Sequence, residues 1–415
     1  MRPAASHRSV FLLTWIVVVI EGSDAFFPPS PSSATRSLKT LLRGGTDNPI
    51  NNGELVSTLA KLDQQWKIEQ AQPRGPKSRW SKILLEKEAE DDDDNEQPGI
   101  QQGPQQDFVY LLEPPTIPSC MIVFLGGAGL GQFPHVAYDQ FLLRVSDKLN
   151  AAVVAAPYTV GLDHFSIAKQ AGEKLRKGIV ACQDDKQYAQ NLPTYCLAHS
   201  LGCKLSTIYM AATSMEFDGI GFIAFNNFSF SQTIGMAREF ADQLRKTTTG
   251  QGLPASADGM LNSIFGLAET AVGALGLDFT PTSEDMRRLM RLKYVDEWKQ
   301  KTRLFCFDED TLDSTPDFVN SCGDMVQVSG LPGNHLTPVF LQLKLEDYVT
   351  ELPEEARGMA SEAMDGFQGA SFGDEEDLNA LVDEVCSFVL GKPPSRGPAK
   401  DDTPLIVAGK TDENV

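Results

Sequence analysis

Three residue types that together can carry out nucleophilic catalysis each follow an apolar run of this sequence. Ser200 stands in YCLAHSLGCKL (195–205), several acids follow the run RLFCF, and His335 follows the run MVQV. A serine is a weak nucleophile by itself, and it needs a histidine to take its proton and an acid to orient the imidazole. Their chain order of serine, acid and histidine is one that serine-dependent enzymes use. The pattern therefore predicts nucleophilic catalysis at Ser200.

The segment around Ser200 departs at one position from G-x-S-x-G, the pattern of a serine on a sharp strand-to-helix turn. Gly202 supplies the second small residue, but Ala198 replaces the first glycine. One added methyl group is compatible with a close approach of strand and helix, so we predict a nucleophile here. The alternative is a serine that only turns a strand into a helix.

His335 is the histidine placed to act as the base, because it follows both Ser200 and the acids in the chain. It lies in GLPGNHLTPVF, a loop containing Gly and Pro after the last predicted strand. The other histidines are His7 in the presequence, His135 and His164 in loops after earlier strands, and His199, whose side chain should point away from the serine. We interpret His135 and His164 as structural or solvated.

The acid of the triad is expected directly after RLFCF, in the segment DEDTLD. The candidates there are Asp308, Glu309, Asp310 and Asp313. We favour Asp310, because its spacing from the strand end and to Leu312 best fits a strand–turn–acid arrangement. Asp308 and Asp313 remain alternatives, and a solvated acidic loop is the other interpretation of this segment.

Two backbone N–H groups are needed to stabilise the oxyanion of an acyl-transfer reaction. We predict one at Leu201, directly after the serine, and the other at Gly127 or Ala128 in the loop GGAGLG that follows MIVFL. The same loop fails the dinucleotide-binding pattern G-x-G-x-x-G, because Gln132 stands where the third glycine belongs. Seven scattered cysteines without a C-x-x-C pair indicate a reduced compartment. No cofactor and no metal ion are expected.

Apolar runs alternate with helical patterns between residues 106 and 392, which predicts one α/β domain. The predicted strands are 108–112, 121–125, 151–156, 194–198, 220–225, 303–307 and 325–328. Continuous apolar strands alternating with helices predict a mostly parallel sheet covered by helices on both faces. The three chemistry-bearing positions then meet at the carboxyl ends of the strands. Residues 231–300 are predicted to be a helical cap, with Thr282 or Ser283 capping one of its helices.

The remaining segments are predicted to carry an address, a linker and a tail. Residues 1–25 have two arginines before an apolar run too short to span a bilayer, as a signal peptide does, and 26–46 are basic and rich in serine, as in a plastid transit peptide. This predicts delivery to a plastid, with secretion as the alternative. Residues 47–105 are predicted to form a docking helix, 54–68, and an acidic disordered linker, and 393–415 a flexible tail.

The charge balance excludes one class of partner. The formal net charge is −20, with 56 acidic against 36 basic residues. A surface of that sign repels phosphate backbones, so no nucleic-acid binding is expected.

Several segments together resemble an uncharacterised α/β-hydrolase-like family of cyanobacteria, algae and plants, a domain of unknown function. The segments are FLGGAGLG, APYTVGLDH, HSLGCKL, FNNFSF, FDEDTLD and GNHLTP, and the resemblance covers roughly residues 105–345. It implies the α/β-hydrolase fold, a triad of Ser200, an acid within 308–313 and His335, and a plastid location. It implies no particular substrate.

Two functions from different classes remain. The favoured one is a plastid serine hydrolase of esterase, lipase or thioesterase type, acting on a small-molecule acyl ester or thioester through an acyl-enzyme. Apolar residues of the predicted cap suggest a lipophilic substrate, and a peripheral membrane contact stays open; these residues are Phe265, Leu267, Val272 and Leu275. The alternative is a non-catalytic scaffold of the same fold that binds a ligand or a partner protein. A complete triad favours the hydrolase, because a scaffold need not keep it.

Overall fold

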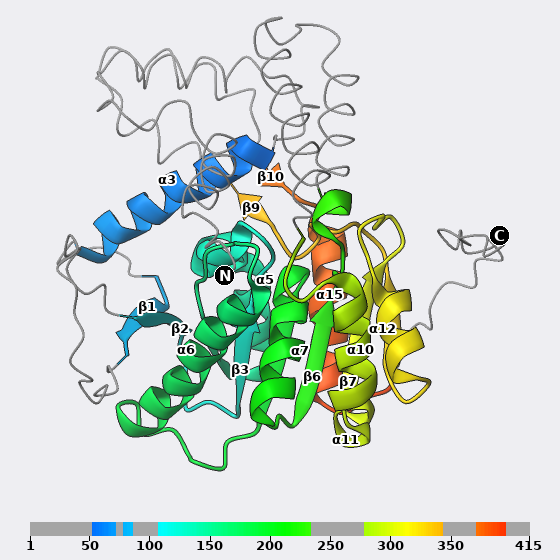
Figure 1. Cartoon of the computed structure of the whole chain (residues 1–415). Coiled ribbons are helices and arrows are strands. Elements are labelled where there is room, and N and C mark those ends of the chain that lie inside the picture. The colour runs from blue at the N-terminus through cyan, green and yellow to red at the C-terminus, as the bar shows by residue number, and fades with distance from the viewer. Residues whose placement is uncertain (1–51, 72–77, 86–106, 234–277, 343–370, 396–415) are drawn as a thin grey trace, which may run out of the picture.

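An eight-stranded, mostly parallel sheet forms the centre of the molecule (Figure 1). The computed structural model describes residues 52–71, 78–85, 107–233, 278–342 and 371–395. The strands are β1 (Trp80–Leu84), β2 (Phe108–Leu112), β3 (Cys120–Leu125), β4 (Ala151–Ala155), β5 (Thr194–His199), β6 (Gly219–Ile223), β7 (Thr302–Phe307) and β8 (Gln327–Leu331). Their order in the sheet is β1-β2-β4-β3-β5-β6-β7-β8. β2 runs antiparallel to both of its neighbours, and the six strands β3 to β8 are mutually parallel. This arrangement is that of the α/β-hydrolase fold, so the predicted fold class is confirmed.

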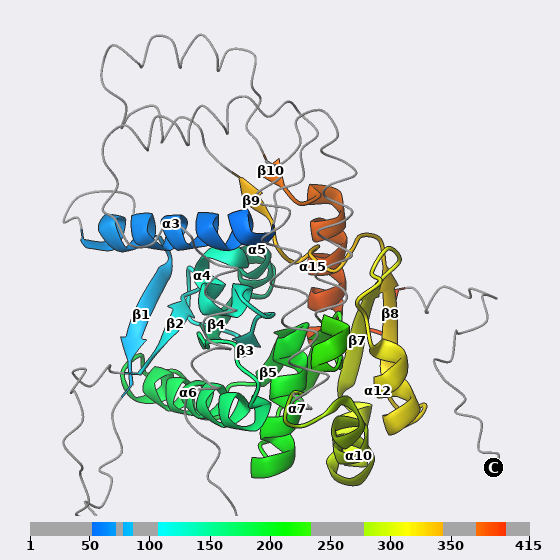
Figure 2. The same ribbon diagram turned by 45° about the horizontal axis from the view of Figure 1, so that its top comes forward.

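Helices cover both faces of the sheet (Figures 1 and 2). The sheet therefore divides the apolar core into two parts, one on each face. On one face lie α6 (His164–Asp184), α7 (Leu201–Thr213), α10 (Ser283–Lys293), α11 (Asp296–Gln300) and α12 (Thr315–Cys322). On the other lie α4 (Pro134–Ala137), α5 (Asp139–Leu149) and α15 (Glu375–Val389). Strand residues alternate between the two parts, with Val123 in the first and Phe124 in the second, as side chains on a pleated strand must. The sheet is therefore buried on both sides, which explains its continuous apolar runs.

A helix and a strand from the N-terminal region pack onto this body. α3 (Asn52–Ala71) contacts α4, and its Leu59 is fully buried, so this helix packs on the body of the domain (Figure 2). β1 lies inside the linker that the sequence analysis predicted after the docking helix, within residues 47–105. The error arose because WSKIL is a half-buried edge strand between Pro-, Gln- and acid-rich stretches, so its apolar pattern is short. Its Trp80 is buried, and the indole Nε1 donates to Asp139 at 2.8 Å.

The last strand of the parallel sheet starts later than predicted. The sequence placed a strand over 325–328, whereas β8 runs from Gln327 to Leu331. The buried part of β8 is Ser329, Gly330 and Leu331, which carries little apolar signal, while Met325 before it is exposed. The shift brings His335 within four residues of the strand end.

The boundary predicted at the C-terminal end of the cap (residues 231–300) lies too far along the sequence. α10 packs against α7 and α12, and its Met286 and Met290 are fully buried in the core. This part of the predicted cap therefore belongs to the helical layer of the sheet. The expected helix cap is confirmed at Thr282, whose hydroxyl accepts from the Asp285 amide at 3.1 Å. The centre of the predicted cap, residues 234–277, lies outside the described residues.

Several other predicted segments also lie outside the described residues. They are the signal peptide (1–25), the transit-like segment (26–46), the acidic part of the linker and the tail beyond residue 395. Within the described part of the chain, no helix is long and apolar enough to cross a bilayer. Two short elements complete the fold, namely η1 (Leu130–Gln132) and the antiparallel pair of β9 (Leu341–Gln342) with β10 (Ser371–Phe372).

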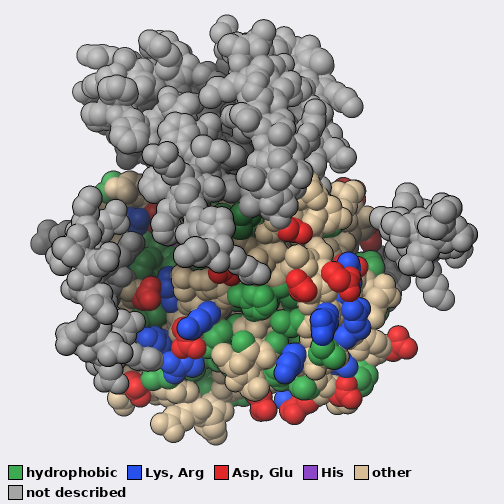
Figure 3. All heavy atoms as spheres, in the orientation of Figure 1, with side chains coloured by type: hydrophobic (Ala, Val, Ile, Leu, Met, Phe, Trp, Pro, Cys, Tyr) green, Lys and Arg blue, Asp and Glu red, His purple; other side chains and the backbone are tan. Residues whose placement is uncertain are grey.

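The described surface is mixed in charge. On the face seen in Figure 3, basic side chains lie beside acidic ones. The helices at the front of that view carry ion pairs, such as Arg176–Glu173 at 2.7 Å on α6 and Arg287–Glu284 at 2.9 Å on α10. Some of the acidic side chains of these helices are thus paired with basic ones.

Candidate active site

Ser200 sits on a strained turn between β5 and α7. Its φ is 54° and its ψ is −120°, a conformation that non-glycine residues adopt only when the surroundings impose it. Its backbone N–H donates to the Ile223 carbonyl at 2.9 Å, which ties the turn to the end of β6. The side chain of Ser200 is thereby held at the carboxyl edge of the sheet, as the sequence predicted.

The two small residues around Ser200 have different roles. A Cβ atom at Gly202 would lie 2.2 Å from the Leu125 carbonyl oxygen and 2.6 Å from that of Gly126, so α7 passes β3 where a side chain cannot fit. Ala198 is fully buried in the core beside Leu125, its partner in the register of β5 and β3. The methyl of Ala198 therefore fills core space, and the departure from G-x-S-x-G leaves the turn intact.

His335 and Asp310 complete a line of hydrogen bonds that starts at Ser200. His335 Nε2 lies 2.8 Å from Ser200 Oγ, and His335 Nδ1 lies 2.8 Å from Asp310 Oδ2. A carboxylate only accepts, so Nδ1 carries the proton and Nε2 of the neutral ring is free to accept from the serine hydroxyl. The second oxygen of Asp310 accepts from the Leu312 amide at 2.7 Å, the spacing on which its choice was based. The three predicted residues thus meet in one site.

The two alternative acids lie elsewhere in the same loop. Asp308 is exposed at the end of β7. Asp313 turns toward α12, where one of its oxygens accepts from both the amide and the hydroxyl of Thr315 at 2.8 Å. Burial raises the pKa of Asp313 to about 6, and the neighbouring Asp310 adds to the shift. Asp310 is the aspartate of this loop that bonds to His335.

The variant Asp313→Asn is expected to gain stability relative to the wild type as the pH rises. The folded pKa of about 6 lies above the ordinary 3.8, so the protonated acid stabilises the fold at low pH and this contribution is lost as the pH rises through about 6. The free energy of unfolding of Asp313→Asn, minus that of the wild type, should therefore increase by about 2 kcal/mol from about pH 4 to pH 8. Urea titrations at both pH values measure it, and a constant difference would contradict the raised pKa.

One of the predicted oxyanion donors already has a hydrogen-bond partner within the protein. The Gly127 N–H donates to the Tyr138 hydroxyl at 2.7 Å, so it is not available to a substrate in this structure. Among the hydrogen bonds of the described residues, none uses the N–H of Ala128, the alternative that the sequence left open, and Ala128 is exposed. The Leu201 N–H is at the first position of α7, where an amide has no partner within its helix. We therefore replace Gly127 with Ala128 as the second candidate donor.

His199 and Tyr138 belong to the site, although the sequence analysis assigned neither of them a role there. His199 Nδ1 lies 2.9 Å from the Tyr138 hydroxyl, and His199 Nε2 lies 2.8 Å from the backbone carbonyl oxygen of His335. Burial lowers the pKa of His199 to about 3. A histidine next to a buried serine was the available signal, and its partners are 61 and 136 residues away in the chain, beyond the reach of local patterns.

The other two histidines within the described residues have partners outside the hydrogen bonds that join Ser200, His335 and Asp310. His135 stacks on Tyr110 at 3.8 Å between ring centroids and faces Asp63 of α3 at 3.2 Å. His164 stacks on Phe279 at 4.4 Å, and burial lowers its pKa to about 3. Both are buried, which agrees with the structural one of the two interpretations, structural or solvated. The described residues contain no cluster of side chains that could hold a metal ion.

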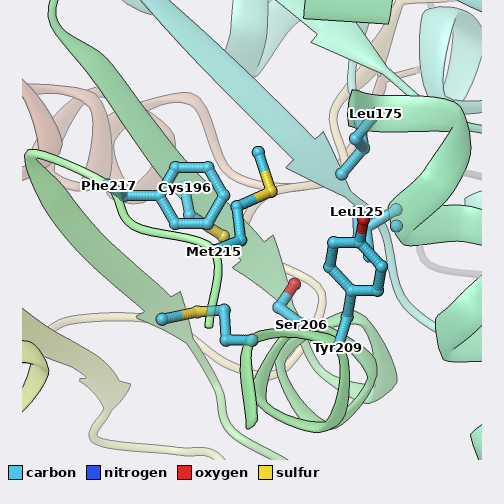
Figure 4. A pocket seen from close by; sticks show the side chains of 9 residues that line it. Leu125, Leu175, Cys196, Ser206, Tyr209, Met215 and Phe217 are labelled. Carbon is cyan, nitrogen blue, oxygen red and sulfur yellow. The ribbon is translucent and has the colours of Figure 1, made fainter. Parts of the chain in front are cut away.

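An apolar cavity under α7 is separate from Ser200. Its lining includes Leu175, Cys196 and Met215, between α6, α7 and the sheet (Figure 4). Met215 follows the end of α7, at the opposite end of that helix from Ser200. The volume of about 10 Å³ has room for one water molecule at most, so this cavity is not a substrate site.

Comparisons with known proteins give one family match and distant similarity to solved structures. Residues 108–359 match the family described as "Protein of unknown function (DUF1350)". Among solved structures, the chain is similar to the Francisella virulence factor BioJ, at 11% identity over 88% of this chain and 100% of that one, with a TM-score of 0.41. It is also similar to carboxyl esterase 2 of the mycorrhizal fungus Tuber melanosporum, at 15% identity over 73% of this chain and 96% of that one, with a TM-score of 0.37. A search of curated proteins found no match.

Proposed function

Since the chain belongs to the family described as protein of unknown function DUF1350, membership brings no activity with it, and we propose one from the site itself. The protein is a serine hydrolase that cleaves a small-molecule ester or thioester through an acyl-enzyme. The observation that carries this proposal is the unbroken line from Ser200 through His335 to Asp310, with both hydrogen bonds at 2.8 Å and the serine on a strained turn. A scaffold without catalysis has no need of all three features together.

The steps follow from the positions of the protons. Ser200 Oγ attacks the acyl carbon while its proton passes to His335 Nε2, and the buried carboxylate of Asp310 stabilises the resulting imidazolium. The N–H groups of Leu201 and Ala128 stabilise the oxyanion. His335 then returns the proton to the leaving alcohol or thiol. A water molecule, deprotonated by His335, then attacks the acyl-enzyme. The bond between the acyl carbon and Ser200 Oγ breaks, the carboxylic acid leaves, and Oγ takes the proton back from His335.

Labelling with a fluorophosphonate probe tests the proposal. Protein from about residue 47 onward should be labelled at one serine, and labelling should vanish in Ser200→Ala and His335→Ala, because the first lacks the nucleophile and the second lacks its base. Ser206→Ala is the matched control, since Ser206 is a buried serine of α7, six residues after Ser200, and its replacement should leave labelling unchanged. A folded wild type that takes up no probe would support the non-catalytic scaffold instead. Labelling that survives Ser200→Ala would place the nucleophile elsewhere.

We further propose that the protein acts in a plastid on a lipophilic acyl compound. The location rests on the signal-peptide and transit-peptide composition of residues 1–46, and the substrate class rests on the apolar residues between 265 and 275. Imaging a fluorescent protein fused behind residues 1–46 tests the location, and secretion of the fusion would contradict it.

Comparing hydrolysis of short-chain and long-chain acyl esters tests the substrate class, and a preference for short chains would contradict it.

A further inference from the structure

A chain of buried hydrogen bonds joins the loop after β3 to the loop that carries His335. The Gly127 N–H donates to the Tyr138 hydroxyl at 2.7 Å, and that hydroxyl lies 2.9 Å from His199 Nδ1. On the other side of the ring, His199 Nε2 lies 2.8 Å from the His335 carbonyl oxygen. His199 directly precedes Ser200, so these hydrogen bonds link the loop after β3 to the loop with His335 through the residue next to the nucleophile.

The proton positions in this chain are fixed by its two ends. A carbonyl oxygen only accepts, so His199 Nε2 carries a proton and donates a hydrogen bond to the backbone carbonyl oxygen of His335. The neutral ring then has a lone pair on Nδ1, which accepts from the Tyr138 hydroxyl. The oxygen of Tyr138 is thereby oriented to accept from Gly127. Each member has one arrangement that satisfies all of its partners.

Burial keeps the chain in this arrangement over the ordinary pH range. Tyr138 is 0% exposed and His199 is 1% exposed. Loss of hydration lowers the pKa of His199 to about 3 and raises the pKa of Tyr138 above its usual value. A neutral ring beside His335 also adds no charge that would compete with the imidazolium formed during hydrolysis.

We propose that His199 and Tyr138 are positioning residues of the hydrolase, which hold the backbone of His335 and the loop Gly127–Ala128 at fixed places relative to Ser200. This inference rests on the function proposed above. The His199 bond holds the peptide of the residue whose Nε2 must stay 2.8 Å from Ser200 Oγ. At the other end, the Tyr138 hydroxyl accepts from the Gly127 N–H, so this amide is already paired, while the next N–H, that of Ala128, has no partner among the hydrogen bonds of the described residues.

Position 199 allows one substitution that keeps the hydrogen bonds and one that removes them. A glutamine at 199 has an N–H₂ group that can donate to the His335 carbonyl and an oxygen that can accept from Tyr138, whereas a methionine of similar size can do neither. A displacement of about 1 Å of a catalytic group can lower the rate about 100-fold. We expect His199→Met to lower the maximal rate of fluorophosphonate labelling about 10- to 100-fold, with the half-saturating probe concentration unchanged, and His199→Gln to stay within about 5-fold of the wild type.

Tyr138→Phe gives an independent variant if His199→Met does not fold. It removes the hydroxyl alone and should lower the maximal labelling rate about 10-fold. The matched control is Tyr294→Phe, which removes another buried tyrosine hydroxyl, bonded to Thr302 at 2.7 Å, and should leave the labelling rate unchanged. Melting temperatures recorded alongside separate a loss of fold from a loss of rate.

The outcomes distinguish this inference from the function on which it rests. A labelled wild type with slow His199→Met and Tyr138→Phe, and near-normal His199→Gln, supports positioning. A labelled wild type with folded variants that all react at the same rate overturns positioning and leaves the hydrolase standing. A slow His199→Gln that matches His199→Met also overturns it, because the hydrogen bonds would then not be what matters. An unlabelled, folded wild type overturns the proposed hydrolase and the positioning role together.

Discussion

Asparagine in place of Asp310 is expected to lower the turnover of ester or thioester substrates about 10,000-fold. Asp310 accepts the Nδ1 proton of His335 at 2.8 Å, and its side chain is 0% exposed, so no water can replace it there. An asparagine would present an N–H₂ group to Nδ1 and favour the ring tautomer with the proton on Nε2. That tautomer cannot accept the proton of Ser200. Steady-state kinetics of a substrate found by library screening would measure the loss.

Asp313→Asn is the matched control for this experiment, because it makes the same chemical change three residues away. Asn at 313 keeps an oxygen that can accept from Thr315, and Asp313 has no bond to His335 among the contacts of the described residues. Its turnover should stay within about 10-fold of the wild type, since it changes only a charge near the imidazolium. A larger loss for Asp313→Asn than for Asp310→Asn would contradict the assignment of the acid.

The order and spacing of the site residues could be predicted because each one follows a strand. A parallel sheet brings the carboxyl ends of its strands to one edge, so Ser200 after β5, Asp310 after β7 and His335 after β8 had to lie near one another once the strands were recognised. The apolar runs that identified most strands were strong because the sheet is buried on both faces. Choosing Asp310 among the acids depended on one local contact, the turn to Leu312, which sequence spacing can capture.

The rest depends on contacts between distant residues or on weak local patterns. The Gly127 amide is taken by Tyr138, whose hydroxyl is in turn fixed by His199, and no spacing rule connects these three residues. β1 is an edge strand with alternating exposure, so its pattern is weaker than that of a buried strand. The boundary of the cap was misplaced because the amphipathic pattern of α10 shows that it packs on something, but not on what.

Alanine in place of Gly202 is expected to destabilise the protein although it lies in a helix. Helix propensity alone would make this change stabilising by about 1 kcal/mol. The added Cβ, however, would lie 2.2 Å from a backbone oxygen of β3, which cannot move aside as a flexible side chain could. Overpacking of this kind costs about 1–3 kcal/mol and occasionally more, so we expect a net loss of about 2 kcal/mol in the free energy of unfolding. Chemical denaturation would measure it.

The same substitution should slow catalysis, because the atoms that must shift belong to Leu125 and Gly126, where the loop with the candidate oxyanion donor Ala128 begins. A shift of about 1 Å there would lower the maximal rate about 100-fold. Gly161→Ala is the matched control, since a Cβ at this exposed glycine would meet its nearest atom, Ile167 Cδ1, at an ordinary 3.6 Å. Its stability should stay within about 0.5 kcal/mol of the wild type. If Gly202→Ala behaved like Gly161→Ala in both stability and rate, the close passage of α7 over β3 would not be what fixes the turn at Ser200.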